Sequence, residues 1–177
     1  VRCICGAEEG IYATMRALLR PRDHVIVITP CYQSLQSIAN TICVTTCVDL
    51  VSTSEGWRVD IPFLKQWILE NTKMIIINFP HNPTGAVPSR EDFEALISLA
   101  REHNLYLFCD EVYHGLERTP ATQLPFGATV YEKAISLGVI SKSYGLAGLR
   151  VGWLVSQDAD VLDRISKYKH YLSICNS

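Results

Sequence analysis

Short apolar runs alternate with amphipathic segments along almost the whole chain, and this alternation limits the possible folds more than any other feature. The apolar or β-branched runs predict seven strands, at residues 1–5, 24–29, 43–48, 73–78, 105–109, 134–140 and 152–155. Segments with helical spacing lie between them, near residues 8–20, 32–40, 60–70, 89–103 and 158–172. Strands that alternate with helices form a largely parallel sheet covered on both faces. The sequence therefore predicts an α/β fold, a three-layer α/β/α sandwich with a mostly parallel sheet of about seven strands.

The segment 89–103 has the clearest helical pattern. Ser89 is a suitable N-cap residue, and Glu91 and Asp92 follow in the first turn, where the helix dipole favours acids. The longest stretch without a regular pattern is 115–131, and we expect it to be irregular.

Composition excludes several classes of protein. The chain has 177 residues, of which 48% are hydrophobic and 19% charged, as in soluble globular domains with a core. Its net charge is −2 and its basic residues are scattered, so no nucleic-acid or membrane partner is predicted. No apolar run reaches the ~18 residues that a membrane-spanning helix needs, and the first residues do not resemble a signal peptide. We expect a cytoplasmic protein.

The seven cysteines give no sign of a disulfide framework or a metal site. Their number is odd, no pair has CxxC spacing, and no cluster combines them with histidine. Most lie in apolar runs, where a free thiol behaves as a small hydrophobic side chain. The sequence predicts reduced cysteines in the core of a cytosolic protein and no metal site.

Chemically unusual residues follow five of the predicted strands. The loops concerned are Gly6-Ala7-Glu8, Pro30-Cys31-Tyr32, residues 81–85, residues 110–113 and Ser141-Lys142. In an open parallel sheet, ligands bind beyond the carboxyl ends of the strands, where loops and helix N-termini converge. The five loops are therefore expected to share one binding site.

The residue types in these loops fit a phosphorylated aromatic aldehyde. Asp110 follows an apolar strand, so its carboxylate needs a cationic partner, and a partly desolvated Lys142 is a nucleophile toward a carbonyl group. Arg150, Ser141 and the amides of residues 6–8 suit a phosphate, and Tyr32 offers a face for stacking. Pyridoxal 5'-phosphate needs all of these groups at once.

Three segments carry a resemblance to a known family. They are "NFPHNPTG" (78–85), "CDEVYHGL" (109–116) and "SKSYGLAGLRVGW" (141–153), and they occur in the family's order. Asn82 and Asp110 are 28 positions apart, and Lys142 and Arg150 are 8 apart, which is also similar to the family. Through essentially all of its length the chain resembles the class I/II aminotransferases of fold type I, the aspartate aminotransferase-like pyridoxal phosphate enzymes.

The resemblance implies a role for each matching residue. Lys142 would hold the cofactor as a Schiff base and move the substrate's proton, and Asp110 would keep the pyridine nitrogen protonated. Asn82 and Tyr113 would donate hydrogen bonds to the phenolate oxygen. The implied catalytic residues are Lys142, Asp110 and Tyr113; the implied cofactor-binding residues are Gly6, Ala7, Glu8, Tyr32, Asn82, Asp110, Tyr113, Ser141, Lys142 and Arg150.

The resemblance also implies a domain organisation. Residues 1–177 correspond to the pyridoxal phosphate-binding large domain, without the family's N-terminal arm and C-terminal small domain. The arginine that binds the substrate's α-carboxylate usually belongs to that small domain. Family members of full length are homodimers, so a homodimer is expected for the full-length protein, and weak or no activity for residues 1–177 alone.

The implied reaction is amino group transfer between an amino acid and a 2-oxo acid, with the substrate pair left open. Two other functions remain open. The same cofactor chemistry serves carbon–sulfur β-lyases, and this fold also forms the effector domain of some transcriptional regulators. One departure from the family concerns the phosphate loop, where Cys5 precedes Gly6 and the frequent serine or threonine is missing.

Overall fold

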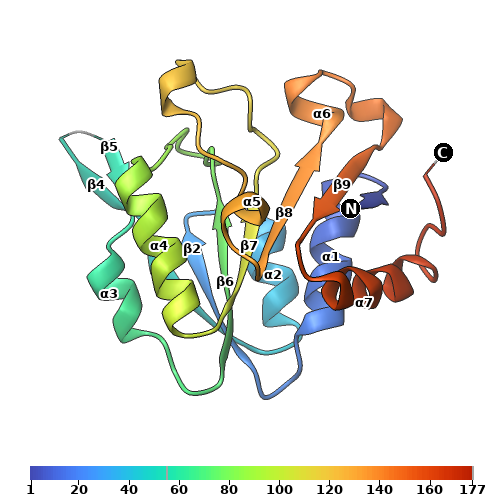
Figure 1. Cartoon of the computed structure of the whole chain (residues 1–177), viewed down its shortest axis with the longest axis horizontal. Helices are drawn as coiled ribbons and strands as arrows, with labels where there is room; N and C mark the ends of the chain where they lie inside the picture. Colours follow the sequence, from blue (N-terminus) through green and yellow to red (C-terminus); the bar gives the residue numbers. More distant parts are fainter. Residues whose placement is uncertain (55, 177) are drawn as a thin grey trace.

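The computed structural model describes residues 1–54 and 56–176 and confirms the predicted α/β sandwich (Figure 1). The central sheet has seven strands in the order β1-β9-β8-β7-β6-β2-β3. All seven predicted strands are present: β1 (Arg2–Ile4), β2 (His24–Thr29), β3 (Val44–Asp49), β6 (Thr72–Asn78), β7 (Tyr106–Asp110), β8 (Ala134–Val139) and β9 (Gly152–Val155). The five neighbouring strands β3, β2, β6, β7 and β8 are parallel, and β9 is antiparallel to both β8 and β1. Ser177, the last residue of the predicted domain, lies outside the described residues.

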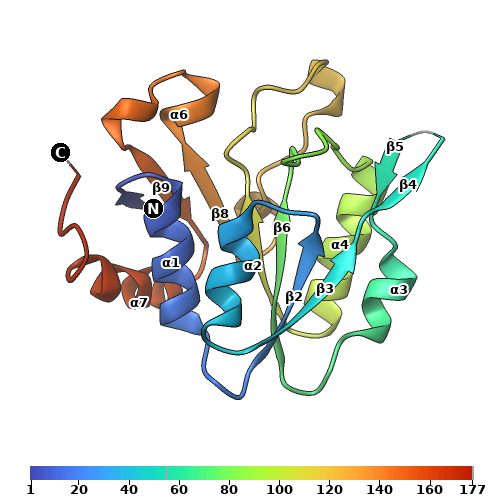
Figure 2. The same ribbon diagram turned by 180° about the vertical axis from the view of Figure 1, so that it is seen from behind.

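Helices cover both faces of the sheet (Figures 1 and 2). One hydrophobic cluster joins the sheet to α1 (Ala7–Leu18), α2 (Gln33–Asn40) and α7 (Ala159–Lys169). A second cluster, on the other face, joins it to α3 (Ile61–Gln66) and α4 (Arg90–Glu102). The predicted N-cap of α4 is confirmed, because Ser89 Oγ accepts a hydrogen bond from the Asp92 amide at 3.0 Å.

The apolar runs bury both faces of the central strands. In β6, Met74 and Ile76 belong to one cluster, and Ile75 and Ile77 belong to the other. Successive side chains point to opposite faces of a strand, so a continuous apolar run fills two layers at once. Each fully buried side chain of this kind contributes roughly 1.5–3 kcal/mol. The packed strands are therefore a rigid support for the loops at their carboxyl ends.

Several short elements were not predicted from the sequence. They are the hairpin of β4 (Val51–Thr53) and β5 (Gly56–Arg58), the 3₁₀ helices η1 (Pro120–Thr122) and η2 (Ala147–Leu149), and the short helices α5 (Gly127–Val130) and α6 (Ile140–Ser143). Stretch 115–131 is thus only partly irregular. The helix expected at 60–70 is shorter than predicted, since α3 ends at Gln66. In the described part of the chain, no helix is both long and apolar enough to cross a membrane.

The prediction that the cysteines lie in the core is wrong for most of them. Cys43 and Cys109 are buried, whereas Cys3, Cys47 and Cys175 are exposed. Cys3 and Cys47 lie on the edge strands β1 and β3, and Cys175 follows the last helix. An apolar run at a sheet edge has one uncovered side, which its sequence does not reveal. All seven cysteines are free thiols.

Candidate active site

A pocket opens at the carboxyl ends of β2, β6, β7 and β8, where the sequence predicted a binding site. Its volume is about 220 Å³. Nine of the ten predicted site residues line it: Ala7, Glu8, Tyr32, Asn82, Asp110, Tyr113, Ser141, Lys142 and Arg150. Four further residues complete the wall: Asn78, Val112, Val139 and Ala147. Loops far apart in the sequence thus meet because parallel strands end at one edge.

Asp110 is the buried acid of the pocket. As the last residue of β7 it pairs in register with Asn78 of β6 and Leu137 of β8, and it is only 2% exposed. Burial raises its pKa to about 7, although its Oδ1 accepts a hydrogen bond from the Val112 amide. Within residues 1–54 and 56–176, no basic side chain forms an ion pair with it. A ligand with a protonated ring nitrogen would supply the cationic partner that the sequence called for.

Asn78 fixes the loop that carries Asn82. Its Nδ2 donates to the Asp110 carbonyl oxygen at 3.1 Å, and its Oδ1 accepts from the Asn82 amide at 3.0 Å. The side chain is 1% exposed. Asn78 therefore connects the end of β7 to the loop opposite it, a role that sequence analysis missed.

His81 connects the same loop to the segment that carries Tyr32. Its ring nitrogens lie 2.7 Å from the Thr84 hydroxyl and 2.5 Å from the Pro30 carbonyl oxygen. Burial lowers the pKa of the imidazole, which favours the neutral form. His81 therefore has a structural role beside the pocket.

Lys142 and Tyr113 lie together at the outer end of the pocket. Lys142 belongs to α6, and its Nζ is 5.7 Å from the centre of the Tyr113 ring. Ser143 Oγ donates to the His114 carbonyl oxygen at 2.7 Å, which holds α6 against the segment after β7. Lys142 is exposed, so the expectation of partial desolvation is wrong for the described chain. The short α6 lies beyond the carboxyl end of β8 (Figure 1).

Another group of lining residues suits an anion. The first-turn amides of α1 have no intrahelical acceptor, and Ala7 and Glu8 of this turn line the pocket beside Ser141 and Arg150. A helix N-terminus and a guanidinium group both favour a phosphate.

Gly6 contributes by its lack of a side chain and not by its amide. The Gly6 N–H donates to the Ile4 carbonyl oxygen at 3.0 Å, and Gly6 is the one predicted site residue that is not among those lining the pocket. Gly6 has φ 82°, and a Cβ at this position would overlap the Arg150 guanidinium group. Only glycine combines this backbone conformation with so close an approach of Arg150.

These groups together accommodate a specific kind of ligand. The pocket offers a buried carboxyl group at its base, an amine at its mouth, an anion site at one end and the Tyr32 side chain in its wall. This set of groups fits a phosphorylated heteroaromatic aldehyde with a basic ring nitrogen.

Comparison with known proteins agrees with this geometry. Residues 1–176 match the family model described as aminotransferase class I and II. The chain belongs to this family. As a member of the class I and II aminotransferases it shares 32% identity over 173 residues with an aspartate aminotransferase of Thermotoga maritima, covering 96% of this chain. It is 33% identical over 160 residues to an arginine–pyruvate transaminase of Pseudomonas aeruginosa, covering 88% of this chain and 40% of that protein.

Solved aminotransferase structures have the same fold. The N-succinyldiaminopimelate aminotransferase of Mycobacterium tuberculosis superposes with a TM-score of 0.92 at 30% identity, over 98% of this chain and 46% of the other. A structure described as a PLP-dependent aminotransferase from Streptococcus suis gives a TM-score of 0.90 at 34% identity, again over 98% and 46%. The chain spans 45% of the length of the Thermotoga protein.

Four residues that line the pocket were not predicted, and they differ in whether the sequence contains a sign of their role. Asn78 can be recognised, because a polar residue at the carboxyl end of an otherwise apolar strand is unusual. Val112, Val139 and Ala147 show no such sign, since an apolar residue that lines a pocket has the same pattern as one in the core.

Proposed function

We propose that the complete protein to which this chain belongs is a pyridoxal 5'-phosphate-dependent aminotransferase that transfers an amino group between an amino acid and a 2-oxo acid. Residues 1–177 are its cofactor-binding large domain. The observation that carries the proposal is Asp110, a buried carboxyl group without a basic partner among the described residues, which faces the same pocket as the Lys142 amine. The proposal includes a homodimer in the cytoplasm.

Each end of the pocket has one task in this proposal. Asp110 would hold the ring nitrogen in its protonated form, and Tyr32 would cover one face of the ring. Asn82 and Tyr113 would donate to the ring's oxygen. The phosphate would lie between Arg150, Ser141 and the first turn of α1.

Bound pyridoxal 5'-phosphate supplies a ring that accepts the electron pair left on the substrate's α-carbon. The protein's own share is to position groups and move protons. Lys142 would hold the aldehyde end covalently and, once released by the incoming amine, would carry the proton at the α-carbon. Its position above the Tyr113 ring keeps the amine at the mouth of the pocket, where substrate arrives.

The relatives favour amino transfer over the alternative functions. The similar proteins reported above are named as aminotransferases, and their names differ in the amino donor. No observation in the described chain favours a β-lyase or a regulator.

The test uses the complete protein with pyridoxal 5'-phosphate. A panel of amino acids is supplied with 2-oxoglutarate, pyruvate or oxaloacetate, and the appearance of the new amino acid is measured. We expect transfer from at least one donor and its loss, by at least about 1000-fold, in Lys142→Ala, since both covalent attachment and proton movement depend on this amine.

Two results would contradict the proposal. Release of ammonia and a thiol from a cysteine conjugate, without transfer, would identify a lyase. Cofactor binding without turnover of any donor, together with sequence-specific DNA binding, would identify a regulator.

A further inference from the structure

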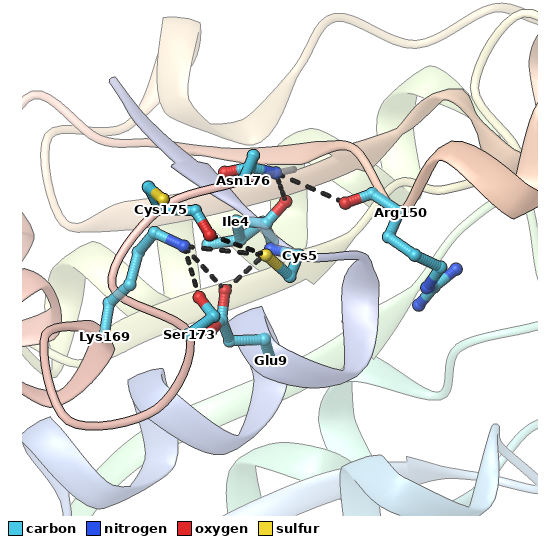
Figure 3. Close-up of polar contacts among 8 residues, drawn as sticks. All are labelled: Ile4, Cys5, Glu9, Arg150, Lys169, Ser173, Cys175 and Asn176. Atoms are coloured by element: carbon cyan, nitrogen blue, oxygen red, sulfur yellow. Dashed lines mark hydrogen bonds and ion pairs between the residues drawn. The ribbon is translucent and has the colours of Figure 1, made fainter.

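We propose that Asn176 is a positioning residue for the phosphate end of the pocket. Its side-chain Nδ2 donates to the Ile4 carbonyl oxygen at 2.7 Å and to the Arg150 carbonyl oxygen at 3.2 Å (Figure 3). These carbonyls belong to the two chain segments that flank the proposed phosphate site, one leading into α1 and the other bearing Arg150. The inference rests on the proposed function, because it assigns Asn176 a part in binding the cofactor's phosphate.

The Ile4 carbonyl oxygen is the point at which the contacts meet. It accepts from Gly6 N–H at 3.0 Å and from Asn176 Nδ2 at 2.7 Å. The first bond shapes the turn that places Gly6 beneath the Arg150 guanidinium group, and the second ties that turn to the Arg150 backbone.

The sheet alone gives this region little support. β1 has three residues, and its last pairing with β9 joins Ile4 to Gly152. The Ile4 and Arg150 carbonyl groups are both acceptors, so they cannot bond to each other. The Asn176 side chain donates to both and so adds a link between the two segments at the end of the β1–β9 pairing.

A second set of contacts anchors the same C-terminal segment, residues 169–176. Glu9, in the first turn of α1, accepts from the Cys5 amide at 2.6 Å and from Lys169 Nζ at 3.1 Å through one oxygen. Lys169 Nζ also donates to Ser173 Oγ at 2.7 Å. The two charged side chains are 11% and 9% exposed. The segment is therefore fixed at both ends to the turn that begins α1 (Figure 3).

The test compares two ligands that differ only in the phosphate. The dissociation constants of pyridoxal 5'-phosphate and of pyridoxal are measured for the complete protein and its variants by absorbance titration. Asn176→Ala is expected to raise the dissociation constant of pyridoxal 5'-phosphate about 10-fold, the scale of the two hydrogen bonds lost. The dissociation constant of pyridoxal should change by less than about twofold. Asn176→Asp should weaken the phosphorylated ligand further, because a carboxylate would face two carbonyl oxygens.

Asn71→Ala is the matched control. Asn71 Nδ2 also donates to a backbone carbonyl oxygen, that of Arg22, at 2.8 Å, but Arg22 precedes β2, at the end of that strand away from the pocket, and belongs to neither segment that flanks the proposed phosphate site. We expect no change in either constant. Asn176→Ser, which keeps a hydroxyl donor, serves if Asn176→Ala does not fold.

Unchanged affinity for pyridoxal 5'-phosphate in the Asn176 variants would overturn the inference, and so would equal weakening of both ligands, which indicates a general structural role. Failure of the proposed function looks different, because the unmodified protein itself would then transfer no amino group or would not bind pyridoxal 5'-phosphate, and neither result involves the Asn176 variants.

Discussion

Asp110, the last residue of β7, and Glu111, directly after it, are consecutive carboxyl groups that point to opposite sides of the sheet. Asp110 lines the pocket, whereas Glu111 lies on the other side and accepts from the Gly127 amide at 2.7 Å, at the start of α5. Burial raises the pKa of each to about 7. The alternation of side chains along a strand therefore separates one carboxyl group for ligand binding from one for structure.

The raised pKa of Asp110 predicts how stability depends on pH without cofactor. Between about pH 4 and pH 7 the folded chain binds more protons than the unfolded chain, so its stability falls as the pH rises and the loss is complete above this range. Asp110→Asn removes this titration. At pH 8 we expect the variant to be more stable, by about 4 kcal/mol, the free energy that corresponds to a pKa raised from about 4 to about 7, and the difference to shrink toward pH 4. Thermal unfolding of the cofactor-free protein at both pH values measures it; a difference independent of pH would contradict the argument.

Gly6 gives a second prediction at this scale. Gly6→Ala places a Cβ on a residue with φ 82° and makes it overlap the Arg150 guanidinium group. It should lower the unfolding free energy by about 1–3 kcal/mol and weaken the binding of pyridoxal 5'-phosphate at least about tenfold. Gly148→Ala is the control, because a Cβ there meets no atom within 4 Å and its φ is not positive. Equal effects of the two substitutions, by unfolding and cofactor titration, would refute the role of Gly6.

Most of the site could be predicted from the sequence, for a physical reason. Asp110, Asn82 and Lys142 lie at or shortly after strand ends, and parallel strands bring such positions together whatever their separation in sequence. The internal use of the Gly6 amide and the exposure of Lys142 could not be predicted, since both depend on how neighbouring segments pack over a loop.

At the scale of elements, length decides what the sequence reveals. β2 and β9 have the predicted bounds, because a buried strand is a continuous apolar run. Helix α5 has four residues and depends on a contact with Glu111, 16 positions before Gly127. An element so short has no periodicity of its own, and the contact that stabilises it is non-local.

Asn78 links two elements, and its loss tests that link. Asn78→Ala removes one of the two donors to the Asp110 carbonyl oxygen, which keeps its bond from the Phe79 amide, and leaves the Asn82 amide without its acceptor. We therefore expect a loss of about 2 kcal/mol in unfolding free energy and weaker cofactor binding. Asn71→Ala, which removes one exposed hydrogen bond, should cost less than about 1 kcal/mol. If urea unfolding gave similar losses of unfolding free energy for both variants, the contacts of Asn78 would contribute no more to stability than an exposed hydrogen bond.

For the whole molecule, the sequence predicted the layers but not the order of the strands. β9 lies antiparallel between β8 and β1, so the first and last strands are neighbours in the sheet. Pairing of segments about 150 positions apart leaves no periodic pattern in either one. The apolar runs show that strands exist, and packing decides which of them pair.

The open position of Lys142 leads to a prediction about residues 1–177 alone. Lys142 is exposed in the described chain, and the family resemblance places the arginine for the substrate's α-carboxylate in another domain. We expect the isolated chain to transfer amino groups at least about 100-fold more slowly than the complete protein, since positioning of the substrate is lost. Equal rates in a direct assay of both proteins would refute this expectation.

The central claim is that one amine in this pocket holds pyridoxal 5'-phosphate beside Asp110. The most direct measurement is borohydride reduction of the complete protein with bound cofactor, followed by peptide mapping by mass spectrometry. We expect a pyridoxyl group on Lys142, and no stable label in Lys142→Ala. A label on another lysine of the unmodified protein, or undiminished labelling of the variant, would contradict it.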